Sequence, residues 1–340
     1  MTIESHSPTT ASAALWKLLN VTLTSAGIRR LDNLNLDIAV GVTTVVGHSG
    51  AGKTSLLNIL AGMERPTSGS VQHIPRVQMG DGAPFSLPIF WAPQDGGLWP
   101  HLSVIQHLTA VFDPNSLTSR RSQQDSEDYL DNLLADFDLN HRRETFPSKL
   151  SQGEQSRLSV CRAIAAHPAA LIMDEPLAHV DPIRRPVYWN LIRSHLLRTG
   201  ASLLFSTHEP DVAVRESKFI VCLQEGKLVH SGSTQQLYQA PPHKSAAEFL
   251  GAINWFDSAE AAHWLPEHQA DQNHVAVRPE NLQLEVDQNA DIEILSFQFC
   301  GGYSETTLKH ISASAEKTII HRPPANLHFA GQRVRIKVLS

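Results

Sequence analysis

One stretch of the chain has the residue types and spacing of a phosphate-binding loop. Residues 47–54 read Gly-His-Ser-Gly-Ala-Gly-Lys-Thr and fit the pattern G-x-x-x-x-G-K-[ST]. Glycines let backbone N–H groups point inward at phosphate oxygens, and the positive end of the following helix adds to this attraction. Lys53 is expected to reach the outer phosphates of a nucleotide, and the Thr54 hydroxyl is expected to bind Mg²⁺. The alternative is a glycine-rich turn without a ligand.

A second group of polar residues ends an apolar run at residues 170–173. Asp174 and Glu175 follow it directly, and open parallel sheets bind ligands at the carboxyl ends of their strands. Adjacent strand residues point to opposite faces, so the two carboxylates are predicted to have different roles. Asp174 is expected to hold Mg²⁺ and its waters, and Glu175 to polarise the water that attacks a γ-phosphate. The alternative is an acidic strand end capped by Pro176.

The elements that must position these residues follow from the apolar pattern. A buried strand at 42–46 precedes the glycine loop, a helix at 55–63 follows it, and antiparallel strands are predicted over 15–46. Further strands are predicted at 170–173, 203–206 and 219–223, and amphipathic helices at 125–143 and 155–167. After residue 264 the alternation becomes β-type. The predicted organisation is a disordered lead-in at 1–13, a first domain at 14–245 and a second domain at 246–340.

The order of the polar motifs resembles that of the ATP-binding subunits of ABC transporters over about residues 15–240. The matching residues are Gly47–Thr54, Gln94, the signature residues 150–154 (Leu-Ser-Gln-Gly-Glu), Asp174, Glu175, Asp181 and His208. The resemblance implies an α/β P-loop NTPase fold with a RecA-like core, an antiparallel β subdomain and a helical subdomain at about 95–165. A small all-β, OB-like domain is expected to follow.

The resemblance assigns a role to each matching residue. Gln94 touches Mg²⁺ or the attacking water and reports the nucleotide state to membrane subunits. Ser151 and Gly153 close over the γ-phosphate bound to the other subunit of a dimer, and His208 contacts that phosphate and orients Glu175. Ser151 followed by Glu154 also reads as a helix-capping box, and the two roles are compatible.

The predicted site therefore has three sets. The catalytic residues are Glu175, His208 and Gln94. The metal ligands are Thr54, Gln94 and Asp174. The residues that bind ATP are Gly47, His48, Ser49, Gly50, Ala51, Gly52, Lys53, Thr54, Ser55, Ser151, Gly153 and Asp181.

Three positions depart from the family pattern. Gln152 replaces the first glycine of the signature, and Ala178 replaces a small polar residue in the D-loop, residues 177–181. Ser25 stands where an aromatic residue usually stacks on adenine, and the candidate replacement is Trp16 on a neighbouring strand or another aromatic residue. Loss of the aromatic ring is expected to weaken ATP binding by ~1 kcal/mol or more while leaving the phosphate chemistry intact.

The C-terminal region resembles the OB-type (TOBE-like) regulatory domain of importer ATPases, mainly through Arg278-Pro279-Glu280. From residue 251 onward it has 7 Lys and Arg against 11 Asp and Glu, so the basic groove of a nucleic-acid-binding OB fold is missing. A metal site is not expected, because the histidines there lack ligand spacing; they are His263, His268, His274, His310, His321 and His328. Residues 97–104 resemble the surface that receives a permease helix, and core packing is the alternative.

Composition limits the remaining possibilities. The 340 residues carry a net charge of −6, and three separated cysteines indicate a reducing compartment. No apolar run approaches the ~18 residues of a spanning helix, and the N-terminus lacks the pattern of a secretory signal. Nucleic acid is not an expected partner.

The resemblance implies an ATP-hydrolysing importer subunit that is peripheral to the cytoplasmic face of the inner membrane. Its expected partners are a second copy, two integral-membrane permease subunits and, indirectly, an extracytoplasmic solute-binding protein. The solute class is ions, oxyanions, phosphonate, iron, polyamine or sugar. The alternative is a regulatory or soluble ABC-type ATPase with weak hydrolysis. Ser151 lies 57 residues after Gln94, which leaves no space for the coiled-coil insertion of a DNA-repair ATPase.

Overall fold

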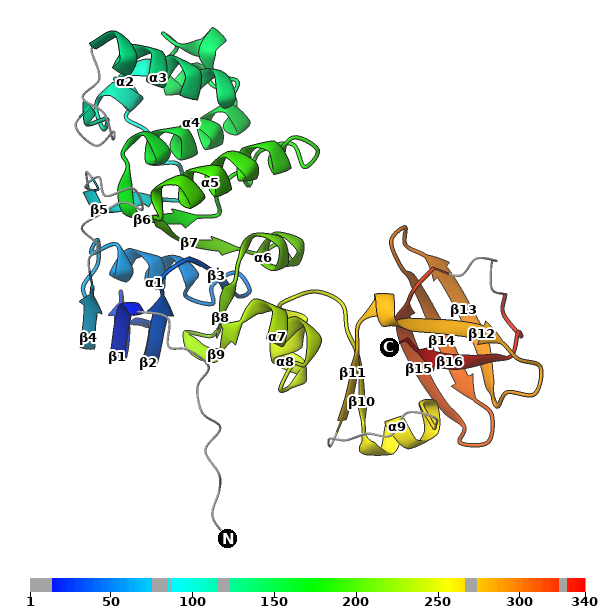
Figure 1. Cartoon of the computed structure of the whole chain (residues 1–340). Coiled ribbons are helices and arrows are strands. Elements are labelled where there is room, and N and C mark those ends of the chain that lie inside the picture. The colour runs from blue at the N-terminus through cyan, green and yellow to red at the C-terminus, as the bar shows by residue number, and fades with distance from the viewer. Residues whose placement is uncertain are drawn as a thin grey trace. The chain divides into compact units, whose positions relative to one another are not determined.

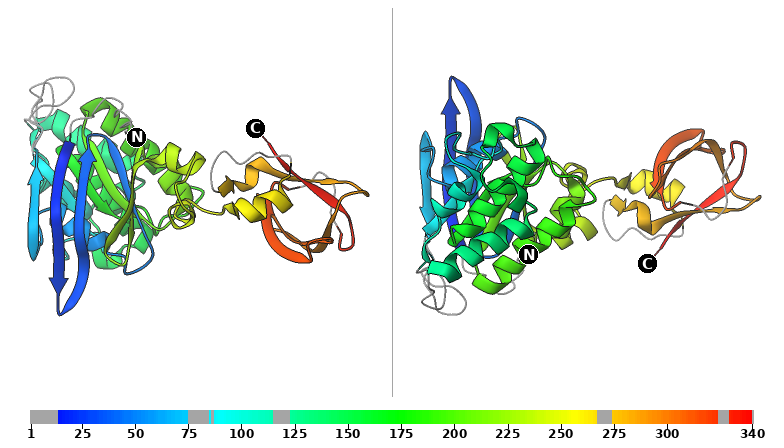
Figure 2. Two further views of the ribbon diagram at one scale, coloured as in Figure 1. Left: turned by 90° about the horizontal axis from the view of Figure 1, so that it is seen from below. Right: turned by 90° about the horizontal axis from the view of Figure 1, so that it is seen from above.

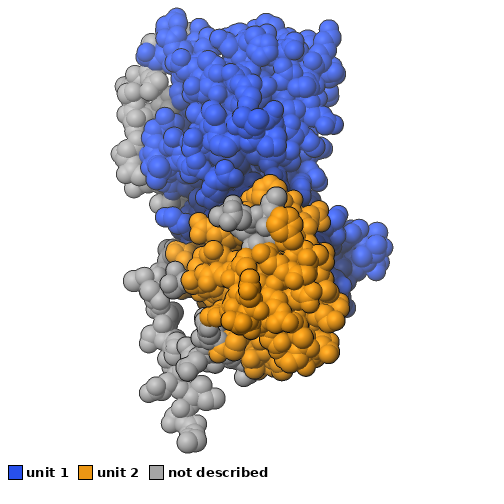
Figure 3. Space-filling view, turned by 90° about the vertical axis from the view of Figure 1, so that its right-hand side faces the viewer, with its two compact units in different colours: residues 1–234 blue, residues 235–340 orange. Residues whose placement is uncertain are grey.

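A computed structural model describes residues 14–74, 85, 87–114, 123–266, 274–323 and 329–339. The predicted lead-in at 1–13 and the histidines His268 and His328 lie outside the described residues. The chain divides into two compact units, residues 1–234 and 235–340 (Figure 3). Among the described helices, none has the length and apolar character needed to cross a bilayer.

A six-stranded sheet forms the centre of the first unit. Its spatial order is β5 (Leu87–Ala92), β6 (Pro168–Asp174), β7 (Ser202–Thr207), β3 (Val42–Val46), β8 (Phe219–Gln224) and β9 (Lys227–Ser233). All neighbours are parallel except β8 and β9. Every residue of β6 and β7 is buried, as expected for parallel strands covered on both faces. The carboxyl ends of β3, β6 and β7 therefore meet at one edge, where the predicted motifs begin.

A smaller antiparallel sheet covers one side of this core. Its order is β2 (Ile28–Ala39), β1 (Ala14–Ser25) and β4 (Ser68–His73). Helix α1 (Lys53–Leu60) lies between this sheet and the central one (Figure 1). Leu56 and Leu57 of α1 pack with Leu18, Leu36 and Ile172 in one apolar cluster. Burial on both sides holds the first turn of α1 at the edge of the central sheet.

Helices occupy the other side of the first unit, and the α-helices among them contribute side chains to a second apolar cluster (Figure 1). They are α2 (Val104–Thr109), α3 (Gln123–Asp136), the short η2 (Asn140–Arg142) and η3 (Pro147–Lys149), α4 (Gln152–Ala165), α5 (Arg185–Thr199) and α6 (Pro210–Glu216). The helix predicted at 125–143 ends at Asp136. Asp138 has a φ of 53°, a left-handed conformation that does not continue an α-helix.

The second unit is small and mostly β. Its helices are α7 (Thr234–Gln239), α8 (Lys244–Glu248), α9 (Ser258–Trp264) and the short η4 (Pro279–Asn281). Its strands are β10 (Asn254–Asp257), β11 (His274–Val277), β12 (Leu282–Val286), β13 (Ile292–Phe299), β14 (Ser304–His310), β15 (Ala315–His321) and β16 (Val334–Val338). The strands curve around one apolar core (Figure 2). The predicted fold class, an α/β core followed by a small all-β unit, is confirmed.

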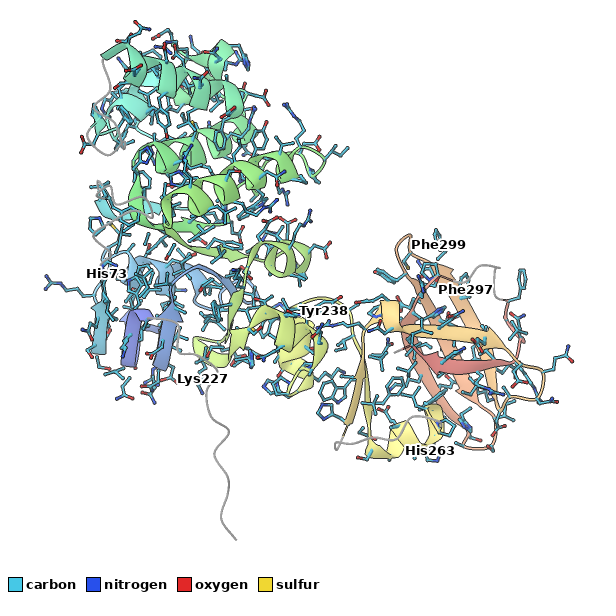
Figure 4. The ribbon with its side chains drawn as sticks, in the orientation of Figure 1. His73, Lys227, Tyr238, His263, Phe297 and Phe299 are labelled. Carbon is cyan, nitrogen blue, oxygen red and sulfur yellow. The ribbon has the colours of Figure 1, made fainter. Side chains whose placement is uncertain are left out.

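Arg278 fastens the start of the second unit to its β-strands. The buried guanidinium donates to the carbonyl oxygens of Tyr238 (3.1 Å), Ala247 (3.2 Å), Gly251 (3.1 Å) and Ala252 (3.0 Å). It also lies 4.2 Å from the centre of the Tyr238 ring, which Figure 4 labels. These bonds tie α7 and α8 to the C-terminal strands. The compact unit consequently begins at residue 235, whereas the sequence placed the domain boundary after residue 245.

Substitution Arg278→Lys is expected to destabilise the second unit by about 1–3 kcal/mol, because an ammonium cannot replace a planar guanidinium that reaches five carbonyls, that of Leu250 at 3.5 Å included. Amide hydrogen exchange over residues 235–252 is the measurement, with faster exchange expected. Arg322→Lys, at an exposed arginine of the same unit, is the matched control. Equal protection in the two variants would contradict the role given to Arg278.

His195 in α5 gives the first unit a sensitivity to acid. The residue is 2% exposed, and among the described residues neither ring nitrogen has a hydrogen-bond partner. Burial, together with nearby His167 and Arg198, lowers the pKa of His195 from 6.5 to about 3. Below pH 6.5 the His195 ring is therefore protonated in the unfolded chain but stays neutral in the folded chain. The free energy of unfolding consequently falls as the pH falls below 6.5.

Urea unfolding at pH 7.5 and pH 5.5 tests this assignment. His195 is expected to contribute a loss of about 1.4 kcal/mol at the lower pH, which His195→Leu removes. His101→Leu, at an exposed histidine, serves as the control and is expected to keep the wild-type pH dependence. An unchanged pH dependence in His195→Leu would show that the buried ring does not cause the effect.

Candidate active site

The phosphate loop joins β3 to α1, as predicted. Gly52 caps the helix with φ 102°, and a Cβ atom there would lie 2.7 Å from the carbonyl oxygen of Arg30, so this position requires glycine. The Lys53 side chain folds back over the loop. Its Nζ donates to the carbonyl oxygens of Gly47 (2.8 Å) and His48 (3.2 Å). The loop thus surrounds one ammonium group, a suitable centre for binding phosphate.

Asp174 connects the phosphate loop to the two central strands. The Thr54 hydroxyl donates to its Oδ2 at 2.6 Å, and the Ser206 hydroxyl donates to its Oδ1. Asp174 and Ser206 are paired residues of β6 and β7. Ser206 was not predicted as a site residue, although a serine two residues before His208 in an apolar strand was a signal for it.

Glu175 is the point where three predicted catalytic residues meet. Its Oε2 accepts from Nε2 of Gln94 at 3.3 Å, and its Oε1 lies 3.0 Å from Nδ1 of His208. Its backbone has φ 50°, an uncommon value for a residue with a side chain, and its N–H donates to Oγ of Ser206 at 3.0 Å. The carboxylates of Asp174 and Glu175 thus contact different side chains, Thr54 and Ser206 for Asp174 and Gln94 and His208 for Glu175, and their different roles remain a prediction.

A cavity of about 210 Å³ opens beside Glu175. Gln94 and Glu175 line it together with Gln152, Gln155 and His179. Gln152, which replaces the first glycine of the signature, therefore lines the same cavity as Glu175.

The signature residues form the start of α4. Oγ of Ser151 accepts from the N–H of Glu154 (3.2 Å), and Oε2 of Glu154 accepts from the N–H of Ser151 (2.8 Å), which is a capping box. Burial opposes ionisation of Glu154, but hydrogen bonds from Ser151 and Arg142 lower its pKa to about 2. Gly153 lies against the D-loop, where a Cβ atom would be 3.1 Å from the carbonyl oxygen of His179.

Within the described part of one chain, some of the predicted site residues are not hydrogen-bonded to the others. Within its described part, Ser151 and Gly153 make no hydrogen bond to the phosphate loop. Oδ1 of Asp181 accepts from the N–H of Ile183 at 2.7 Å, just before α5. Within the described residues, these three residues make no hydrogen bond to the group centred on Glu175.

Trp16 does not provide the missing adenine platform. It is 1% exposed, and its indole N–H donates to the carbonyl oxygen of Leu60 at 3.2 Å. Its ring also contacts His73, with centroids 5.1 Å apart. The ring therefore belongs to the core under the antiparallel sheet, and the proposed replacement was wrong. Ser25 is exposed at the end of β1, the strand that also holds Trp16, so Trp16 does not lie on a neighbouring strand as expected.

Arg162 and Ser159 of α4 support the segment that follows Gln94. The buried Arg162 donates to the carbonyl oxygens of Gly96 (2.9 Å) and Gly97 (2.8 Å), and the Ser159 hydroxyl also donates to Gly96 (3.1 Å). Burial lowers the pKa of Arg162 to about 10. The guanidinium lies 4.7 Å from the ring centre of Trp99, which is 37% exposed. Sequence reasoning missed both residues, although an arginine within an apolar helix was a signal.

Comparison with known proteins agrees with this geometry. The profile of the ABC transporter family matches residues 31–178. The spermidine/putrescine import ATP-binding protein PotA of Pseudomonas fluorescens is 30% identical over 278 residues, 76% of this chain and 74% of PotA. The Fe(3+) ions import ATP-binding protein FbpC of Brucella melitensis is 32% identical over 241 residues, 69% of this chain and 65% of FbpC.

Solved structures extend the comparison to the fold. The dimeric, post-hydrolysis ATP-binding cassette MJ0796 with ADP and Pi aligns with a TM-score of 0.54 and 26% identity, over 64% of this chain and 98% of the cassette. An ATP-binding subunit of an ABC transporter aligns at 0.55 and 20% identity, over 66% of this chain and 92% of its own, which supports the fold alone. With the phosphate loop, the paired carboxylates and the relatives in agreement, the chain belongs to the ABC transporter family of ATP-binding subunits.

Proposed function

We propose that this chain hydrolyses ATP as one of two identical subunits of an importer, and that this hydrolysis powers solute uptake. The observation that carries the proposal is the convergence of Gln94 and His208 on the carboxylate of Glu175. This group lies next to Asp174, whose carboxylate contacts the phosphate loop through Thr54. A base, its orienting groups and a phosphate site are thereby assembled at one sheet edge.

The residues have separate tasks in the reaction. Glu175 accepts a proton from water as the water oxygen bonds to the γ-phosphorus, and the bond to the β-phosphate oxygen breaks to release ADP. Gln94 and His208 each contact one oxygen of the Glu175 carboxylate and so orient this carboxylate toward the attacking water. The Lys53 ammonium, which donates to loop carbonyls in this structure, binds the β- and γ-phosphates when ATP occupies the phosphate loop.

The oxygen atoms near the phosphate loop fit Mg²⁺. A Thr54 hydroxyl and an Asp174 carboxylate lie 2.6 Å apart, and both are hard oxygen donors of the kind this ion prefers. Gln94 offers an amide oxygen from the neighbouring loop. When bound, the ion neutralises negative charge on the phosphates.

The second copy completes the site. Ser151 and Gly153 stand at the start of a 14-residue helix and make no bond to the phosphate loop of their own chain within the described residues. A serine hydroxyl, a glycine N–H and a helix N-terminus are suited to an anion. We therefore place them, with Asp181, against the γ-phosphate site of the partner. The dimeric state of the MJ0796 cassette supports this arrangement.

The importer assignment is supported by the relatives. The curated proteins are import subunits for spermidine/putrescine and for Fe(3+) ions. The separate β-rich second unit agrees with the TOBE-like domain expected from Arg278-Pro279-Glu280. We place the chain at the cytoplasmic face of the membrane, bound to two permease subunits that receive solute from a binding protein. Polyamines and ferric iron are the first solutes to test.

A regulatory ATPase with weak hydrolysis is the second candidate. It is favoured by one observation, the exposed Ser25 at the position of the adenine-stacking residue, with Trp16 buried elsewhere. The contacts of Gln94 and His208 with the Glu175 carboxylate favour an active ATPase over an inactive one.

Glu175→Gln is expected to lower ATP turnover by about 100-fold or more, because an amide cannot accept the proton from water. ATP binding is expected to persist and to trap the closed dimer, which size-exclusion chromatography with ATP detects. Glu144→Gln, at an exposed carboxylate, is the matched control for turnover. Wild-type turnover in Glu175→Gln would refute the proposed function.

Ser25→Tyr is expected to strengthen ATP binding about fivefold, because the ring supplies the stacking surface that the chain lacks. Ser25→Ala is the control and is expected to leave the dissociation constant unchanged. Equilibrium titration with ATP and with a ribose triphosphate lacking the base provides the measurement. The adenine interpretation is contradicted if Ser25→Tyr tightens both ligands equally or neither.

A further inference from the structure

Arg185, the first residue of α5, binds two separate loops. Its Nη1 lies 2.6 and 2.5 Å from the two carboxylate oxygens of Glu209. Its Nη2 donates to the carbonyl oxygens of Val180 at 3.2 Å and Ala178 at 3.4 Å. One guanidinium therefore holds the D-loop with one nitrogen and the residue after His208 with the other.

Both loops start from the catalytic residues. The D-loop follows Glu175 after Pro176, and Glu209 follows His208, whose ring contacts Glu175. The space enclosed by these segments measures about 10 Å³, room for at most one water molecule. Loops packed this closely transmit displacements to each other.

The D-loop begins in an unusual backbone conformation. Glu175 and Leu177 have φ values of 50° and 63°, a region that costs free energy for residues with side chains. Such a conformation persists only when its surroundings fix it. The two bonds from Arg185 to Ala178 and Val180 supply this restraint directly after the strained residues.

The neighbouring arginine shows what an ordinary surface pair looks like. The side chain of Arg184 is 57% exposed and pairs with the carboxylate of Asp138, which is 45% exposed. Exposed pairs of this kind contribute little to stability. The Arg185 side chain is 11% exposed and binds a carboxylate and two carbonyls at once, which suits a planar guanidinium and not an ammonium.

We propose that Arg185 is a positioning residue that couples the D-loop to the switch segment, residues 207–209. The coupling holds His208 against Glu175 while the D-loop keeps its conformation, and it passes any displacement of the D-loop to His208. This inference rests on the proposed function, since it assumes that His208 and Glu175 act together in ATP hydrolysis.

The test uses the purified full chain with substitutions on both sides of the contact. Arg185→Met keeps the length of the side chain and removes its donors, and Arg185→Lys keeps the charge alone. Both are expected to lower kcat for ATP about 10- to 100-fold while the dissociation constant for ATP changes less than twofold. Arg184→Met is the matched control and is expected to retain the wild-type kcat.

A double-mutant cycle separates positioning from loss of stability. His208→Ala is expected to reduce kcat strongly in the wild-type background and to have little further effect in Arg185→Met, because both changes act through the same contact. Amide hydrogen exchange in Arg185→Met is expected to rise at both 177–181 and 207–209. Losses that multiply, or faster exchange in only one of the two segments, would overturn the proposal.

A second variant keeps the test decisive if Arg185→Met does not fold. Glu209→Gln changes the charge of a side chain that is 38% exposed and is expected to lower kcat in the same direction. If Glu209→Gln and every folded Arg185 variant keep the wild-type kcat while Glu175→Gln is inactive, the coupling by Arg185 is refuted and the proposed function still stands. Full turnover in Glu175→Gln instead refutes the proposed function.

Discussion

The hydrogen bonds that Asp174 receives from Thr54 and Ser206 connect the phosphate loop, β6 and β7. A buried carboxylate is stable only when hydrogen bonds or charges compensate its lost hydration. Two hydroxyl groups from neighbouring elements provide this compensation, because the parallel register places Ser206 beside Asp174. The position of Glu175 depends on the same contact, since its N–H bonds to Ser206. The backbone of Glu175 is therefore fixed by the sheet, and its carboxylate is held by Gln94 and His208.

Three arginines with little solvent exposure bind backbone carbonyls, two in the first unit and one in the second. Arg162 binds the carbonyls that follow Gln94, Arg185 binds those of the D-loop, and Arg278 binds those of α7, α8 and the linker to β10. Several of these carbonyl oxygens lie in loops that supply no sheet or helix partner, and an unpaired buried carbonyl is costly. A guanidinium can satisfy several of them at once. The same chemical solution thus positions the loop after Gln94 and the D-loop in the first unit, and the entry to the second unit.

The motifs near one another in sequence could be predicted well. The strand, loop and helix at 42–60 and the capping box at Ser151 depend on local spacing. Glu175 lies just past β6 with φ 50°, so strand alternation does not account for its divergence from Asp174. Contacts across long stretches of sequence could not be predicted in this way. Ser206 reaches Asp174 because of strand register, and Trp16 is buried because α1 covers its sheet. The roles of Arg162 and Arg185 depend on which carbonyls lie nearby, a property of the folded backbone.

The most direct test of whether Glu175 is the centre of the site compares two single-turnover rates of ATP hydrolysis. One is measured in Glu175→Gln, and the other in the double variant Glu175→Gln with His208→Ala. If His208 acts by holding the Glu175 carboxylate, the two rates are expected to agree within a factor of about three. A further decrease as large as the one that His208→Ala causes in the wild-type chain would contradict this arrangement, because it would show that the histidine acts on ATP independently of Glu175.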